Sequence, residues 1–313
     1  DDMRTEFIDA LERVAADKAI KALVLTGAGK GFCAGGDIAG MQRRMNAPAG
    51  EVGFNGWQRQ QRVHHVQALL HTMPKPVIAA VNGAASGLGA DTALACDFVI
   101  ASEWASFAWS YVLRGIIPDG GGMYFLPRRV GLAKAKELIF TGRQVKLPEA
   151  LALGIVDRQA SAETLVADAQ AWARELSSAS STALALTKTI LNQSFELSSH
   201  DVFAQGSQAQ GICYTSSEHR ASVEAFLAKT GLARHTYYTM VRGIGNPTIR
   251  TIERIASSLN MSVFELLGFD VSDARRALKK SGVNYDELVS AIAKKNRADR
   301  ALARQTRSRK LPS

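Results

Sequence analysis

Two glycine-rich turns, at residues 31–38 and 81–91, are the segments of this sequence best suited to chemistry. Each follows a short apolar run, at residues 22–25 and 77–81, and each leads into a segment with helical character. Backbone N–H groups at the start of a helix favour negative charge. Two such turns brought together would hold one oxyanion, so the sequence predicts a catalytic oxyanion site.

The elements that must position these turns are short strands alternating with helices, which predicts an α/β domain. Apolar residues recur at helical spacing near the start of the chain, at Met3, Phe7, Leu11 and Val14. The same kind of pattern predicts a helix over residues 165–176. Residues 39–55 are mostly small or polar and include Pro48, so we expect a mobile loop there.

Three motifs, in this order, resemble the crotonase superfamily. They are Phe-Cys-Ala-Gly-Gly-Asp-Ile at residues 32–38, Lys-Pro-Val-Ile-Ala-Ala-Val-Asn-Gly at 75–83 and Asp-Thr-Ala-Leu-Ala-Cys-Asp at 91–97. The resemblance covers about residues 1–229 and implies a spiral of ββα units with a helical C-terminal part. It also implies assembly into a homotrimer or hexamer. We find no counterpart of the segment with which the family's spiral begins, and expect its first strands to be missing.

The resemblance implies a coenzyme A thioester as substrate and no covalently bound cofactor. In the family the thioester carbonyl lies between two backbone N–H groups, which by motif belong to Gly36 and Leu88 here. The same motif places Ala34, Asp37 and Ile38 beside the coenzyme. A single oxyanion-hole donor is worth about 3–4 kcal/mol to an enolate-like intermediate. The alternative is that these glycines only form tight turns.

The proton-transfer residues of the familiar members are less well matched. Enoyl-CoA hydratases resemble this chain but carry two glutamates, at the positions of Asp91 and Tyr111. A tyrosine, with an ordinary pKa of about 10, is a poor base at neutral pH. Ordinary hydration is therefore not expected. Asp91 either supports the site or binds a polar group, and the residues leave both alternatives open.

A third carboxylate, Asp119, lies in another glycine-rich segment at residues 113–122. Ring-modifying acyl-CoA isomerases and 4-chlorobenzoyl-CoA dehalogenase resemble this chain in having an aspartate there. One carboxylate can remove a proton from one carbon and return it to another, which is isomerisation. We therefore predict Asp119 as the acid/base. The alternative is an aspartate that stabilises a turn or caps a helix.

The remaining reactive side chains carry weaker signals. His64 and His65 fall in a region that can line an acyl pocket, but we expect them on a polar helix face. The sequence has no His/Asp/Glu ligand cluster, so no metal is expected. Its three cysteines, Cys33, Cys96 and Cys213, are far apart, which is typical of ordinary buried thiols in a reducing compartment.

Composition and charge divide the chain. Of its 313 residues 46% are apolar and 21% charged, which is typical of a soluble, cytoplasmic globular protein without a membrane span or secretory signal. The net charge is +9. Residues 1–229 hold 22 basic and 22 acidic side chains, whereas residues 230–313 hold 16 and 7. This shift predicts a domain boundary and a polyanionic partner for the tail, or else a solvated basic end.

The tail resembles a Cro/repressor-type helix-turn-helix over about residues 229–268, with matching segments at 230–238, 245–252, 255–259 and 262–268. The resemblance implies that Arg234, His235 and Thr236 face DNA base edges in the major groove. Leu227 stands where a small residue is usual, and a first helix is not evident. The alternative is a small all-α domain, residues 230–313, that binds no DNA.

Three functions follow from these patterns. The favoured one is an acyl-CoA isomerase or related crotonase-fold enzyme that uses Asp119. The second is an enoyl-CoA hydratase or acyl-CoA hydrolase. The third is a DNA-binding regulator that keeps an inactive crotonase-like domain.

Overall fold

The computed structural model describes residues 2–46, 48–243 and 247–267. Contacts between residues divide the chain into two compact units, residues 1–219 and 220–313. Within the described ranges, no helix is both long enough and apolar enough to cross a membrane.

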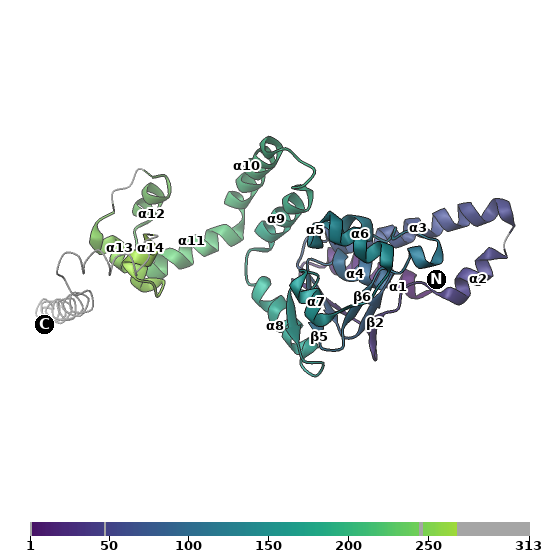
Figure 1. Ribbon diagram of the computed structural model, residues 1–313. Coiled ribbons are helices and arrows are strands. Elements are labelled where there is room, and N and C mark those ends of the chain that lie inside the picture. Colours follow the sequence, from purple (N-terminus) through teal and green to yellow (C-terminus); the bar gives the residue numbers. More distant parts are fainter. Residues whose placement is uncertain (1, 47, 244–246, 268–313) are drawn as a thin grey trace, which may run out of the picture. The chain divides into compact units, whose positions relative to one another are not determined.

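The described strands of the first unit form two four-stranded sheets with helices around them (Figure 1). The order of one sheet is β1-β3-β5-β8 and that of the other is β2-β4-β6-β7. Strands β1 to β6 alternate between the two sheets along the chain, and β7 and β8 each complete one of them. All neighbours are parallel except β6 and β7. The strands are β1 (Leu23–Thr26), β2 (Gly31–Cys33), β3 (Val77–Val81), β4 (Ala84–Ser86), β5 (Phe98–Ser102), β6 (Ser106–Ala108), β7 (Val145–Lys146) and β8 (Arg158–Ala160).

Helices enclose these sheets, which confirms the predicted α/β fold. Every residue of β3 is buried, as expected for a central parallel strand covered on both faces. The predicted helices at the chain start and over residues 165–176 are present as α1 and α8. The helical elements of this unit are α1 (Asp2–Ala16), α2 (Ile38–Met45), α3 (Ala49–Thr72), α4 (Leu88–Ala95), η1 (Val112–Arg114), α5 (Gly122–Val130), α6 (Leu132–Thr141), α7 (Leu147–Ala152), α8 (Leu165–Leu176), α9 (Ser181–Gln193) and α10 (Ser199–Thr215).

The predicted loop over residues 39–55 is wrong, because α2 and the first turns of α3 occupy most of it. Pro48 precedes α3 as its N-cap residue, a place where a proline does not break the helix. Three glycines in the first turns of α3 face open space, so their lack of side chains removes no packing. The helix is anchored further along, where residues such as Leu70 are buried in the core.

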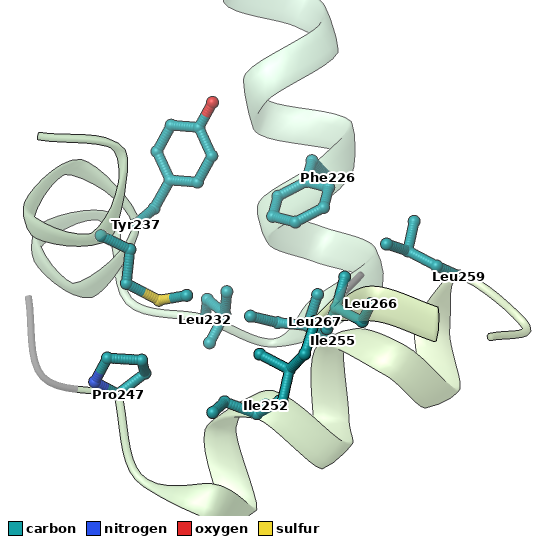
Figure 2. Close-up of a pocket in the computed structure, with 10 residues that line it drawn as sticks. Phe226, Leu232, Tyr237, Pro247, Ile252, Ile255, Leu259, Leu266 and Leu267 are labelled. Atoms are coloured by element: carbon teal, nitrogen blue, oxygen red, sulfur yellow. The ribbon is translucent and has the colours of Figure 1, made fainter. Parts of the chain in front are cut away.

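The second unit, as far as residue 267, is helical. The division between the units falls within α11 (Ser217–Thr230), which is followed by α12 (Arg234–Val241), α13 (Ile249–Ser258) and α14 (Val263–Leu266). Leu227, Leu232 and Ile255 belong to its small core. Figure 2 shows apolar side chains of these helices around a pocket of about 420 Å³. Gly245, Asn246 and residues 268–313, which include most of the predicted basic tail, lie outside the described residues.

Candidate functional site

The two glycine-rich turns lie against each other. Strands β2 and β4, which lie within these turns, pair side by side, with Cys33 aligned to Ala85. Gly35 has a φ of +91°, and a Cβ atom there would lie 2.6 Å from the Ser86 carbonyl oxygen and 3.5 Å from the Leu88 nitrogen. Only glycine fits both this conformation and this approach. The predicted meeting of the two turns is therefore present in the fold.

The second turn also needs its glycines to reach the first. A Cβ atom on Gly89 would lie 2.2 Å from the Cys33 carbonyl oxygen, so α4 begins in direct contact with β2. Gly87 is the N-cap residue of α4 at a φ of 55°, and no side chain caps this helix. The backbone N–H groups of its first turn therefore have no competing side-chain acceptor from the cap. This is the arrangement that an oxyanion requires.

Asp91 is fully buried in the first turns of α4 and holds two aromatic side chains. Trp109 donates from Nε1 to Asp91 Oδ1 at 3.0 Å, and Tyr111 donates its hydroxyl hydrogen to Oδ2 at 2.5 Å. Burial, partly offset by these hydrogen bonds, raises the pKa of Asp91 to about 7. Burial and the neighbouring Asp91 raise the pKa of the Tyr111 hydroxyl. Tyr111 is therefore a hydrogen-bond donor here and not a base.

Gly120, the residue after Asp119, lies against the hydrogen bond between Tyr111 and Asp91. A Cβ atom on Gly120 would lie 2.5 Å from Leu88 Cδ1 and 2.8 Å from Asp91 Oδ2, so the segment packs directly on the second turn. Asp119 itself is part-exposed, at 26%, on a cavity of about 220 Å³. The cavity is lined by His64, Gln67, Ala68, His71, Asp119, Gly120, Gly121, Tyr124 and Phe125.

His64 is exposed, at 47%, as expected for a polar helix face. Its Nε2 lies 3.7 Å from Asp119 Oδ2, and the side chain lines the same cavity. The next residue, His65, contacts a different element, with its Nε2 3.0 Å from Glu12 Oε1 of α1. The missed signal is the helical spacing of His64, Gln67 and His71, which places all three on one face of α3.

The second cavity histidine, His71, is packed among aromatic rings. Its ring lies 5.8 Å from that of Tyr124 and 5.1 Å from that of Phe125, both edge to face. Burial, with the nearby cation of Lys188, lowers the pKa of His71. His71 is thus neutral at physiological pH and contributes a mostly aromatic wall to the cavity.

The residues predicted beside the coenzyme lie at the first turn. Ala34 and Asp37 are exposed, and Asp37 forms an ion pair with Arg43 at 3.2 Å. Ile38 begins α2, and only its backbone is described. Gly36 lies between them, next to the Cε atom of Met41.

The family described as Enoyl-CoA hydratase/isomerase matches residues 1–233. This chain belongs to that family. The predicted membership of the crotonase superfamily is thereby confirmed.

Curated relatives in this family differ in their reactions. The chain is 35% identical over 229 residues to a 1,2-epoxyphenylacetyl-CoA isomerase of Escherichia coli K12, covering 73% of this chain and 86% of that protein. It is 36% identical to a crotonyl-CoA hydratase of Syntrophomonas wolfei, covering 73% and 85%. Family membership therefore leaves isomerase and hydratase both open.

Solved structures in the family share the fold. An enoyl-CoA hydratase/isomerase from Cupriavidus metallidurans CH34 matches with a TM-score of 0.64 and 36% identity, over 72% of this chain and 83% of that one. An enoyl-CoA hydratase from Polaromonas sp. JS666 matches with a TM-score of 0.65 and 34% identity, over 72% and 86%.

The predicted DNA-facing residues lie together in the first turn of α12. Arg234 and His235 are exposed, and Thr236 is part-buried. The preceding Gly231 has a φ of +63°, which gives a sharp turn between α11 and α12. Arg234 forms an ion pair with Glu224 of α11 at 3.0 Å. The family match ends at residue 233, just before α12.

Proposed function

We propose that this family member is an acyl-CoA isomerase. The observation that carries the proposal is the packing of Gly120 on Leu88, which sets Asp119 beside the two meeting turns. The backbone N–H groups of Gly36 and Leu88 would bind the thioester oxygen. Ala34, Asp37 and Ile38 would flank the coenzyme.

Asp119 would move the proton. Its carboxylate takes a proton from the carbon next to the thioester carbonyl, and the C–H electron pair becomes the enolate. The two backbone donors stabilise the charge on the oxygen. Asp119 then returns the proton to a second carbon, so that the double bond shifts and no water enters.

Asp91 and Tyr111 favour isomerisation over hydration. Activation of water by the hydratase route requires two carboxylates, but the second position holds Tyr111, which donates to Asp91. Asp91 is fully buried, whereas Asp119 reaches the cavity. A single accessible carboxylate is suited to moving a proton from one carbon to another. Hydratase or hydrolase activity is the alternative.

Product analysis tests the choice between these reactions. We expect the full chain to convert but-3-enoyl-CoA to but-2-enoyl-CoA, a product of unchanged mass with a shifted double bond. A product heavier by one water would identify a hydratase instead. Release of free coenzyme A would identify a hydrolase.

We also propose that several copies of the chain assemble, as a homotrimer or hexamer. Large apolar side chains are exposed on and between α9 and α10, at Leu191, Phe195, Phe203, Ile212 and Tyr214. Exposed apolar surface of this extent is typical of an interface. Light scattering should give three or six times the mass of the chain, and a single-chain mass would contradict the proposal.

A second candidate function concerns the C-terminal unit. Arg234 and His235 are exposed at the start of α12 directly after the Gly231 turn, and residues 230–313 carry the whole net positive charge. We propose that α12 contacts duplex DNA. Binding should weaken steeply with salt and be reduced by Arg234→Ala. Absence of binding at low salt would overturn this candidate.

A further inference from the structure

The C-terminal unit contains a pocket of about 420 Å³ that neither proposed function uses (Figure 2). Side chains from α11, α12, α13 and α14 line it, and apart from the hydroxyl of Tyr237 every lining side chain is apolar. Two of the lining residues, Leu232 and Ile255, are only 9% and 6% exposed, whereas Leu259 and Leu267 are 37% and 50% exposed. The pocket therefore has a buried floor and an exposed rim.

An apolar space of this size is unfavourable when it is empty. Protein interiors are close-packed, and side chains that border a void lose the contacts that a neighbour would give. Water does not fill such a space readily, because apolar walls offer it no hydrogen-bond partners. Leu232 and Ile255 also belong to the small core of this unit, so the pocket lies where the unit is packed. We therefore expect an apolar group to fill it, and its volume is within the range of about 300–1,000 Å³ that is usual for ligand sites.

The charge of the unit indicates what the other end of the ligand is. Residues 220–267 hold six basic and three acidic side chains. Arg254, which precedes Ile255 on α13, is exposed and donates from Nη1 to the Gly231 carbonyl oxygen at 3.2 Å, beside Leu232. No carboxylate pairs with Arg254 among the residues that the structure describes. An anionic group at the rim would meet this positive charge.

We propose that this pocket binds a medium-chain fatty carboxylate. The alkyl chain lies against Leu232 and Ile255, and the carboxylate stays at the exposed rim, in the positive field of Arg254. One apolar chain with a charged end matches both the apolar lining and the net charge of the unit. Most of the lining residues follow residue 233, where the family match ends, so the site does not depend on the proposed isomerase.

Isothermal titration calorimetry on the full chain tests the proposal, with decanoate and butyrate as probes, below the concentration at which decanoate forms micelles. We expect one decanoate to bind per chain, at least about a hundredfold more tightly than butyrate, because each further buried methylene adds to the affinity. Saturating butyryl-CoA should leave this affinity unchanged, since the proposed thioester site belongs to the other unit. Decanoate should also raise the melting temperature of the protein.

Two pairs of variants locate the site. Leu267→Asp places a negative charge on the rim and should weaken decanoate binding at least about tenfold. Ile249→Asp is its matched control, because Ile249 is 73% exposed in the same unit but does not line the pocket, so the affinity should be kept. Arg254→Gln should weaken decanoate binding about threefold. Arg220→Gln, which removes the same charge from the start of α11, should not.

Several results would overturn the proposal. They are decanoate binding that Leu267→Asp leaves intact, displacement of decanoate by butyryl-CoA, and no binding of decanoate at all. In the last case, a lower mass of Leu267→Asp in light scattering would identify a second copy of the chain as the occupant. The arginine pair keeps the test decisive if Leu267→Asp does not fold. None of these results bears on the isomerase, whose turnover of but-3-enoyl-CoA is measured separately.

Discussion

Two aspartates on either side of Gly120 have opposite environments. Asp91 is fully enclosed, where burial raises its pKa to about 7, although Trp109 and Tyr111 donate hydrogen bonds to it. Asp119 reaches a cavity and lies 3.7 Å from His64. A carboxylate that no substrate can reach supports the structure, whereas one that faces a cavity can exchange a proton. From this difference we propose that Asp91 supports the site and that Asp119 transfers the proton.

The largest effect is expected from Asp119→Asn, which removes the accessible acid/base and keeps its shape. Turnover of but-3-enoyl-CoA should fall about 10²–10⁴-fold. Affinity for a coenzyme A ester should stay within about twofold, since the oxyanion donors are unchanged. Steady-state kinetics and calorimetry measure the two quantities. Unchanged turnover would remove Asp119 from the mechanism.

A second prediction concerns the glycine turns that both aspartates adjoin. Gly35→Ala places a Cβ atom 2.6 Å from the Ser86 carbonyl oxygen, so the turns must separate. We expect a loss of about 10²–10³-fold in kcat, comparable to the loss of one oxyanion donor. Gly29→Ala is the matched control, because Gly29 also has a positive φ of 73° but no atom within 4 Å of the added Cβ. Equal losses in both variants would mean that backbone strain, and not the meeting of the turns, matters.

A third prediction concerns the pH dependence that burial gives Asp91. Between its ordinary value of 3.8 and about 7, the unfolded chain releases this proton while the folded chain keeps it. The free energy of unfolding therefore falls as pH rises through this window, by roughly 1–4 kcal/mol from this group. Asp91→Asn cannot ionise and should become more stable relative to the wild type as pH rises. Urea denaturation between pH 3.8 and about 7 measures the free energy of unfolding of both proteins. A difference between them that stays constant with pH would contradict the raised pKa of Asp91.

The smallest effect is expected from a change at His64, whose Nε2 lies 3.7 Å from Asp119 Oδ2. His64→Gln keeps a donor near the carboxylate but cannot exchange a proton. We expect kcat to fall about tenfold with little change in KM, and the pH dependence of kcat to change. His65→Gln should match the wild type, because His65 faces Glu12. A loss of equal size in both variants would indicate a general effect on α3.

Local patterns in the sequence were sufficient for the two apolar strands that precede the turns, for several helices and for the turns themselves. Residues 32–38 and 75–83 carry their glycines within strand–turn–helix segments, and the pairing of β2 with β4 makes them neighbours. The helices over most of residues 39–55 were missed, because the small residues that suggested a loop include glycines that face open space, where a missing side chain removes no packing. Composition alone cannot show what surrounds a glycine.

The electrostatic roles in the site could not be predicted, because they depend on burial and on contacts between distant segments. The raised pKa of Asp91 comes mainly from burial. His64 meets Asp119 only through the packing of α3 beside the segment that precedes α5.

Proton exchange tests the contrast between the two aspartates most directly. In deuterium oxide, wild type and Asp91→Asn should both incorporate deuterium at the carbon next to the thioester of but-3-enoyl-CoA, measured by mass spectrometry and NMR. Asp119→Asn should incorporate almost none. Exchange at the wild-type rate in Asp119→Asn, together with its loss in Asp91→Asn, would contradict the account and identify the buried carboxylate as the base.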